Sequence, residues 1–178
     1  ISMTVSENNT TFDSRSRCNA IIETNSNTLI AGCVTTIIPE SVISIGDYAF
    51  SYFSRLTTIN IPDSVTSIGK YAFNDCSNLT NITLPNSVTR IGERAFDWCS
   101  SLISINIPES VKSIGQYAFS NCNSLTSVHI KDIESWCNIS FSSTYSNPLY
   151  HAKNLYLNGE LVTELTIPNT VTSLNSSV

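Results

Sequence analysis

The sequence predicts an α/β solenoid, a stack of similar coils. Four glycines, Gly46, Gly69, Gly92 and Gly115, recur at a fixed step of 23 residues. The same step aligns three further residue types: Pro39, Pro62, Pro85 and Pro108; Ala49, Ala72, Ala95 and Ala118; and Phe50, Phe73, Phe96 and Phe119. A fixed period of this size is typical of solenoids, in which each coil contacts mainly its neighbours. This architecture favours a binding surface over an active site.

Each repeat is expected to contain one β-strand. In residues 61–83 and the residue that follows, Leu79, Ile82 and Leu84 show L-x-x-I-x-L spacing, whose last two apolar positions alternate with polar ones. This is the strand pattern of a leucine-rich repeat. Pro62 lacks an amide donor and so ends strand pairing before the chain turns. The fold class is therefore a strand-rich leucine-rich repeat solenoid, with short helical or 3-10 turns on the convex side.

The return limb of each repeat supplies most of the core. Val65 and Ile68 are expected to point inward, and Gly69 to adopt a turn conformation that a Cβ atom would penalise. Ala72 and Phe73 follow on a short helical turn, with Phe73 as the large core residue and Ala72 kept small by close packing. Equivalent side chains should therefore form continuous internal columns along the stack.

The repeat pattern divides the chain into segments. A polar N-terminal segment (1–19) precedes a solenoid (20–178) made of a degenerate coil (20–37), regular repeats (38–60, 61–83, 84–106 and 107–129), an expanded coil (130–166) and a partial repeat (167–178). The degenerate coil holds strand-like runs at 20–22 and 29–30. In the expanded coil, Asn158-Gly159 between apolar runs predicts a hairpin, although its second strand could instead belong to the next coil. Ile130 aligns with Ile167, and the unfinished last repeat indicates a longer parent chain.

Three of the six cysteines, Cys76, Cys99 and Cys122, lie one period apart, at a position that Phe53 fills in the first repeat. A position that accepts Phe or Cys is apolar, so buried free thiols are expected, with a disulfide or metal site as the alternative. Side chains that point the same way in a ladder fit disulfide geometry poorly. Cys18, Cys33 and Cys137 lie outside this ladder, and their redox state stays open.

Composition excludes several functional classes. Charged residues make up 13% of the chain, the net charge is −5, and the nine Lys and Arg are scattered, so nucleic acid is not an expected partner. No apolar run approaches the roughly 18 residues of a membrane helix, so no direct membrane insertion is expected in this segment. His129 and His151 are the two imidazoles, and no acid, base and nucleophile set, phosphate loop or metal-ligand motif accompanies them. We therefore expect no enzyme, no catalytic residues, no cofactor and no metal.

Repeat units such as "LTTINIPDSVTSIGKYAF" and "LTNITLPNSVTRIGERAF" resemble the BspA-like class of leucine-rich repeat proteins, which has this 23-residue unit. The resemblance covers residues 20–174 and includes the irregular stretches "SRCNAIIETNSNTLIAGC" and "DIESWCNISF". It implies a secreted or cell-surface protein of host-associated microbes that attaches to host matrix or cell-surface proteins. The alternative expected partner is a glycan. The alternative function is a structural spacer that projects another domain from the cell surface.

The outward positions of the strands are the candidate ligand face: Thr58, Asn60, Asn81, Thr83, Ser104, Asn106, Ser127 and His129. They form a polar, nearly uncharged ladder, which as simple solvated strand residues would need no ligand. A second aligned column, Tyr48, Tyr71, Arg94 and Tyr117, could pack along the convex surface or form a platform for a sugar or protein. Secondary candidates in the expanded coil are Trp136, Tyr145 and Tyr150.

Overall fold

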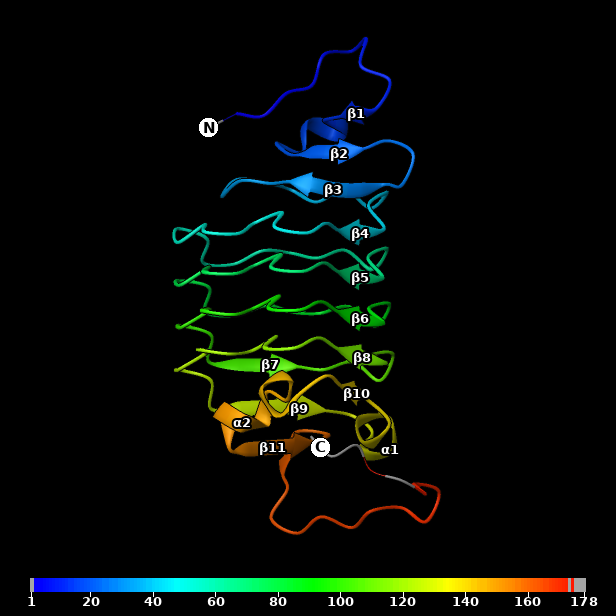
Figure 1. The fold of residues 1–178 in the computed structure, drawn as a ribbon, viewed down its shortest axis with the longest axis vertical. Helices are drawn as coiled ribbons and strands as arrows, with labels where there is room; N and C mark the ends of the chain where they lie inside the picture. The colour runs from blue at the N-terminus through cyan, green and yellow to red at the C-terminus, as the bar shows by residue number, and fades with distance from the viewer. Residues whose placement is uncertain (1, 173, 175–178) are drawn as a thin grey trace.

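The computed structural model describes residues 2–172 and 174, and these residues form one continuous stack of coils. Figure 1 shows the coils stacked along the long axis, with the N-terminal segment at one end and β11 (Asn154–Leu157) with its following loop at the other. In this view the stack is nearly straight. The leucine-rich repeat solenoid that the period predicts is confirmed. The predicted partial repeat falls partly on residues 173 and 175–178, which lie outside the described residues.

One parallel ladder of short strands runs along the return limbs. Its regular members are β4 (Ser44–Ile45), β5 (Ser67–Ile68), β6 (Arg90–Ile91) and β8 (Ser113–Ile114), which pair in register with isoleucine beside isoleucine. At one end β3 (Thr28–Ala31), β2 (Ile21–Glu23) and β1 (Phe12–Asp13) continue the sheet, and at the other β10 (Ser140–Phe141) does so. The L-x-x-I-x-L pattern did not indicate this sheet, because two-residue strands leave no visible alternation.

The second sheet contains the strands that the L-x-x-I-x-L spacing predicts. β7 (Ser104–Asn106) and β9 (Ser127–Ile130) pair in parallel. In the first two regular repeats the same positions hold extended chain linked to the next coil by fewer bonds, such as Thr80 N–H to Thr57 O at 3.2 Å and Ile103 N–H to Thr80 O at 3.3 Å. The prediction is thus confirmed as paired strands for two of the four regular repeats.

The third side of each coil, residues 70–75 in the second repeat, is a run of hydrogen-bonded turns and not the helical turn expected there. Every second amide bonds to the next coil, as in Phe50 N–H to Ala72 O at 2.7 Å and Phe73 N–H to Ala95 O at 2.8 Å. Left-handed φ angles make this alternation possible, 54° at Tyr71 and 55° at Asp75. We call these segments, residues 47–53, 70–76, 93–99 and 116–122, the turn limb.

Helices occur at the two ends of the described chain. They are the 3-10 helices η1 (Arg15–Arg17) and η2 (Thr144–Ser146) and the short α-helices α1 (Ile133–Cys137) and α2 (Leu149–Ala152). Three of the four lie in the expanded coil. There Asp132 caps α1, its Oδ2 accepting from the Ser135 amide at 2.6 Å. These helices accommodate the extra residues of the expanded coil, and the stacking of coils continues through it.

The core is a column of stacked phenylalanines, as the aligned positions predict. Phe50, Phe73, Phe96 and Phe119 are all fully buried. Successive ring centroids lie 5.2, 5.4 and 5.4 Å apart, with interplanar angles of 1°, 1° and 12°. Gly32 closes the N-terminal end of the column, because a Cβ there would lie 2.0 Å from a Phe50 ring carbon. The column is therefore continuous through the regular repeats.

The aligned glycines serve a different purpose from the one predicted. Among the described glycines only Gly159 has a positive φ, so the expectation that Gly69 adopts a turn conformation that a Cβ atom would penalise is wrong. Instead, a Cβ on Gly69 would lie 2.6 Å from the carbonyl carbon of Gly46, and one on Gly92 would lie 2.5 Å from that of Gly69. Glycine recurs because adjacent coils approach too closely there for any side chain.

All six cysteines are buried and lie outside any disulfide bond of the described residues, as expected for the ladder residues. The thiols of Cys76, Cys99 and Cys122 donate to the carbonyl oxygens of Phe50, Phe73 and Phe96 at 3.1–3.2 Å. Burial raises the pKa of Cys76 and of Cys122 to about 12. These thiols act as small core residues that also satisfy backbone acceptors.

The two irregular ends contain hairpins: the strand-like runs at 20–22 and 29–30 pair with each other, and the hairpin predicted at Asn158-Gly159 forms. β2 and β3 are antiparallel. β11 (Asn154–Leu157) and β12 (Glu160–Leu161) are joined through Asn158 and Gly159, whose φ angles of 53° and 87° fit a type I′ turn. β11 pairs in parallel with β9, which sets Leu157 beside Ile130. The alignment of Ile130 with Ile167 is therefore wrong: the next strand of the sheet lies inside the expanded coil.

Candidate functional site

The eight residues predicted to face outward from the strands do so, in two columns. Thr58, Asn60, Asn81 and Thr83 are exposed, while Ser104, Asn106, Ser127 and His129 are partly buried. The parallel pairing aligns Ser104 with Ser127 and Asn106 with His129, and the intervening Ile105 and Val128 are buried. The alternation of a pleated strand thus turns polar side chains outward and apolar ones into the core.

The structure adds two residues to these columns that sequence reasoning missed. Because β11 pairs with β9, Asn154 lies beside Ser127 and Tyr156 beside His129. The Tyr156 and His129 rings stack with centroids 4.7 Å apart and 14° between their planes. The only available signal was the Leu-Tyr-Leu alternation at 155–157, and the broken period hid its register. We call the ten residues the strand face: Thr58, Asn60, Asn81, Thr83, Ser104, Asn106, Ser127, His129, Asn154 and Tyr156.

Hydrogen bonds hold the C-terminal end of the strand face in place. His129 Nε2 lies 3.2 Å from Ser127 Oγ, and Asn154 Nδ2 donates to the Thr126 carbonyl at 3.0 Å. Among the described residues no hydrogen bond engages the carboxamide oxygen of Asn154 or the hydroxyl of Tyr156, so both are left for other interactions. The arrangement can exchange hydrogen bonds with a ligand over several coils.

A second column of side chains runs along the turn limb. Tyr48 and Tyr71 stack at 4.8 Å with 6° between their planes. The guanidinium carbon of Arg94 lies 5.8 Å from the Tyr71 ring centroid and 4.9 Å from that of Tyr117, so the cation sits between two rings. Each of these residues has a left-handed φ of 51–59°, which turns its side chain out of the coil. The aligned positions predicted this contact.

The expanded coil extends this column. Tyr145 stacks on Tyr117 at 5.5 Å, and Tyr150 meets Tyr145 edge to face at 4.9 Å. We call the full set the tyrosine column: Tyr48, Tyr71, Arg94, Tyr117, Tyr145 and Tyr150. Since neighbouring rings cover one another's faces, the column presents mainly ring edges and hydroxyl groups, which favours the packing role over a platform for stacked sugars.

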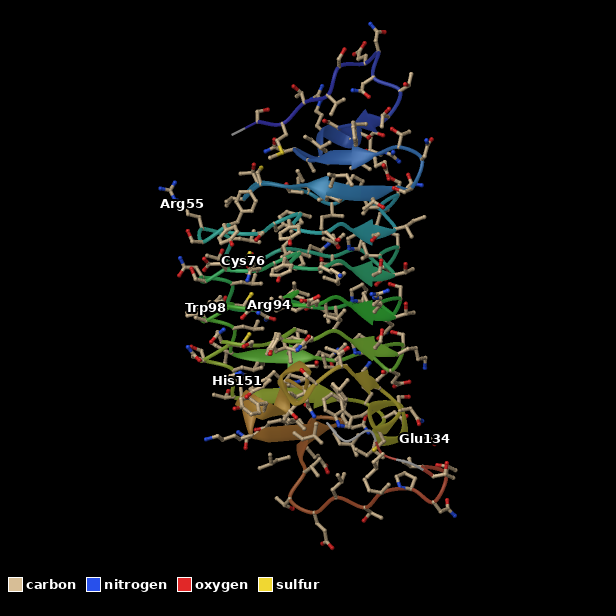
Figure 2. The ribbon with its side chains drawn as sticks, viewed as in Figure 1. Arg55, Cys76, Arg94, Trp98, Glu134 and His151 are labelled. Carbon is tan, nitrogen blue, oxygen red and sulfur yellow. The ribbon has the colours of Figure 1, made fainter. Side chains whose placement is uncertain are left out.

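Trp136, the third secondary candidate, does not join the other two. It is 3% exposed and packs edge to face against Phe141, with centroids 5.3 Å apart. Its place on α1 puts it in the core of the expanded coil, so it cannot contact a ligand at the surface. The exposed tryptophan of the chain is Trp98 in the turn limb, which projects from the edge of the stack in Figure 2.

A buried carboxylate holds Arg94 within the tyrosine column. Asp97 is 1% exposed, and its Oδ2 lies 3.2 Å from Arg94 Nη1. Asn121 Nδ2 donates to the other carboxylate oxygen at 2.9 Å. The preceding coil has Tyr71 and Asn74 at the equivalent positions. The arginine and the aspartate thus form a charged pair that replaces a neutral pair of the regular repeat.

His129 and His151 occupy separate environments. His129 belongs to the strand face, whereas His151 lies on α2 with its ring 5.0 Å from that of Tyr150. Burial lowers the pKa of His151, and its Nε2 is buried with no hydrogen-bond partner among the described residues. Within residues 2–172 and 174, no group of three His, Cys, Asp or Glu side chains could hold a metal ion. In the same residues no helix has the length and apolar character needed to cross a membrane.

Solved structures of bacterial leucine-rich repeat proteins are similar to this chain. A leucine rich cell surface protein from Faecalibacterium prausnitzii A2-165 is 29% identical with a TM-score of 0.63, over 84% of this chain and 44% of that one. A leucine-rich repeat protein from Eubacterium ventriosum shares the fold at 22% identity and a TM-score of 0.68, over 96% of this chain and 50% of that one. A third, from Bacteroides capillosus, is 26% identical with a TM-score of 0.53, over 68% of this chain and 93% of that one.

The chain thus spans about half the length of the first two of these proteins. No curated protein matches it. The family model for the BspA type leucine rich repeat region matches residues 21–148 in six copies. This match covers the stacked coils, their phenylalanine column and most of the strand face. The chain therefore belongs to the BspA type leucine-rich repeat family.

Proposed function

We propose that this chain is a non-catalytic recognition module, secreted or held at a cell surface, which binds a macromolecule of a host or its matrix through the strand face. The observation that carries the proposal is the continuity of that face. Five successive pairs of neutral polar side chains follow the stack, from Thr58 and Asn60 to Asn154 and Tyr156. An array in fixed register can contact an extended partner at many points without rearrangement.

The surface location is supported by a relative. The similar protein from Faecalibacterium prausnitzii is described as a cell surface protein. The six BspA type repeats make up most of the present chain. Solenoid repeats of this kind present extended surfaces to partners, and their stacked coils hold these surfaces rigid. A location outside the cell would give the strand face access to host molecules.

The absence of catalysis is supported by the surroundings of both histidines. His129 shares a hydrogen bond with Ser127 and stacks on Tyr156, and no carboxylate pairs with it among the described residues. His151 Nε2 is buried without a partner in the same set. A general base needs a group that orients it and open access to a substrate. Neither imidazole meets both conditions.

A charge-introducing variant tests the proposal. Thr58→Glu, Asn81→Glu, Ser104→Glu and Ser127→Glu together would place four carboxylates along the strand face. The matched control is Asn86→Glu, Thr89→Glu, Gln116→Glu and Asn123→Glu, which changes four exposed neutral residues outside that face. Both variants carry the same net charge, so a difference between them reports on position and not on charge.

Binding to host cells and to immobilised extracellular matrix is the readout, with circular dichroism to verify folding. We expect the strand-face variant to lose binding and the control to retain it. Equal binding by both variants would contradict the proposal. That result would favour a structural spacer, which makes no specific contact through this face.

A further inference from the structure

The strand face has neighbours that mostly share its neutral character. A flanking column one residue earlier in each of the five coils consists of Thr57, Thr80, Ile103, Thr126 and Lys153, all exposed. In the first four coils, this column and the strand face contain no lysine, arginine, aspartate or glutamate, and Lys153 in the fifth coil is the one such residue of the combined surface. Over the first four coils, the surface offers no carboxylate, lysine or arginine as a counter-ion to a charged ligand.

Most charges of the molecule lie on other sides of the coils. The turns after Pro39, Pro62 and Pro108 carry Glu40, Asp63 and Glu109, all exposed. In the turn limb, Lys70 Nζ pairs with Glu93 at 3.7 Å and Arg94 pairs with Asp97. With a net charge of −5 on the chain, the neutrality of the strand face is a local property. Burying a charged partner group against it would leave that charge unpaired, which is costly.

The polar groups of the surface match hydroxyl groups in hydrogen-bonding character. Serine, threonine and asparagine side chains can both donate and accept. Thr80 and Thr126 use their hydroxyls to bond to the carbonyls of the preceding coil, at 3.4 and 3.2 Å, which exposes their methyl groups. Asn81 and Ser104 have no such internal bond among the described residues. A sugar chain, with alternating hydroxyl and C–H surfaces, offers the complementary pattern.

The residue types that usually anchor a protein partner lie mostly outside the strand face of this chain. Hot spots of protein interfaces are enriched in Trp, Tyr and Arg, while serine is depleted from interfaces. On this molecule the exposed Tyr48, Tyr52 and Trp98 belong to the turn limb, and the exposed Tyr145 and Tyr150 belong to the expanded coil. The strand face has one, Tyr156, at its C-terminal end. Its composition thus favours a hydroxyl-rich polymer over a protein.

We propose that the strand face binds a neutral glycan chain that lies along the axis of the stack, with Tyr156 and His129 at one end of the binding surface. The inference rests on the proposed function and names the class of the partner. Neutral side chains meet a neutral polymer, so binding needs no ion pairs. Successive coils repeat about every 4.8 Å, which lets a linear polymer meet similar groups on each coil.

The test uses the whole chain against an array of neutral glycans, including cello-, xylo-, manno- and malto-hexaose, with heparin as a charged probe. Affinities for the glycans bound are then measured by calorimetry at low and high salt. Tyr156→Ala removes the aromatic end and is matched by Tyr52→Ala in the turn limb. Asn81→Asp with Asn106→Asp adds two charges to the face. Its control is Asn86→Asp with Asn123→Asp, and acidic residues already occupy the positions equivalent to Asn86 in the neighbouring coils.

We expect at least one neutral glycan to bind with an affinity that salt does not change. The Tyr156→Ala variant and the variant with Asn81→Asp and Asn106→Asp should each weaken binding about three- to tenfold for each hydrogen bond lost. The control variants should bind the glycan as tightly as the unchanged chain does. No binding to any neutral glycan, or binding that the strand-face variants leave unchanged, would overturn the inference. In another outcome, the unchanged chain binds deglycosylated matrix proteins but no glycan, and the strand-face variants lose that protein binding. That outcome would refute a glycan as the partner while leaving the proposed function intact.

Discussion

The phenyl rings of Phe73 and Phe96 lie 5.4 Å apart and within 1° of parallel, although 23 residues separate them in the sequence. This contact repeats between successive coils and sets their register. The thiols of the cysteine ladder and the close-packed glycines depend on the same spacing. Every surface column on the molecule follows from it.

Truncating one ring of this column should destabilise the whole stack. Phe73→Ala leaves a cavity between two rings, and we expect a loss of about 3–5 kcal/mol in the free energy of unfolding. Urea denaturation followed by circular dichroism measures it. Tyr52→Ala, at a side chain that is 72% exposed, serves as the control and should change stability by less than about 0.5 kcal/mol. Similar effects of the two substitutions would argue against a stacked core.

Two glycines should respond differently to asparagine. At Gly159 the φ is 87° and an added Cβ would have no atom within 4 Å, so Gly159→Asn should cost less than about 1 kcal/mol. At Gly69 the Cβ would meet the backbone of Gly46 at 2.6 Å, so Gly69→Asn should cost about 3 kcal/mol or more. Urea midpoints compare the two variants. Tolerance at Gly69 would show that the coils are farther apart than the structure has them.

The charged pair in the turn limb should behave as a unit. Arg94→Tyr restores the residue of the neighbouring coils but removes a partner of the buried Asp97 carboxylate, and should cost about 1–3 kcal/mol. Adding Asp97→Asn, the residue type found at Asn74, should recover most of that loss. A double-mutant cycle from thermal or urea unfolding measures the coupling. Simple additivity would mean that the two side chains do not interact.

The cysteine ladder gives a pH dependence of defined sign. The folded pKa of Cys76 and Cys122 is about 12, above the ordinary value of 9.0, because burial disfavours the thiolate. Their contribution to stability is thus complete below pH 9 and is lost as pH rises toward 12. Denaturation at several pH values should show this loss, and replacing both by Ala should reduce it. At pH 8 iodoacetamide should modify them only after unfolding, and rapid modification of the folded chain would contradict their burial.

The period predicts what depends on spacing alone, and that includes most of the fold. Phe50, Phe73, Phe96 and Phe119 stack because identical positions on adjacent coils must meet. The role of Gly69 was predicted wrongly, because sequence does not separate a need for positive φ from a need for close backbone approach. The sheet of Ser-Ile dipeptides escaped detection because two residues carry no periodicity.

The positions of the strand-face residues are predicted correctly as far as His129, whereas Asn154 and Tyr156 are not predicted. Tyr156 lies beside His129 because the expanded coil folds its extra residues into η2 and α2 before returning to the sheet. The number of extra residues that form these helices depends on tertiary packing, which no local sequence pattern encodes. For the same reason Trp136, Tyr145 and Tyr150 could be identified as a group of aromatics, but not sorted into one buried and two exposed residues.

The register of the strand face across the expanded coil can be measured by crosslinking, and the whole binding surface depends on it. A chain carrying Ser127→Cys and Asn154→Cys is treated with a short bismaleimide, and the crosslink is located by mass spectrometry. A second chain carries Ser127→Cys and Glu164→Cys, the pair that would meet if Ile130 aligned with Ile167. We expect efficient crosslinking of residues 127 and 154, which are direct partners on β9 and β11. A crosslink between 127 and 164, with none between 127 and 154, would show that the strand face does not continue onto β11.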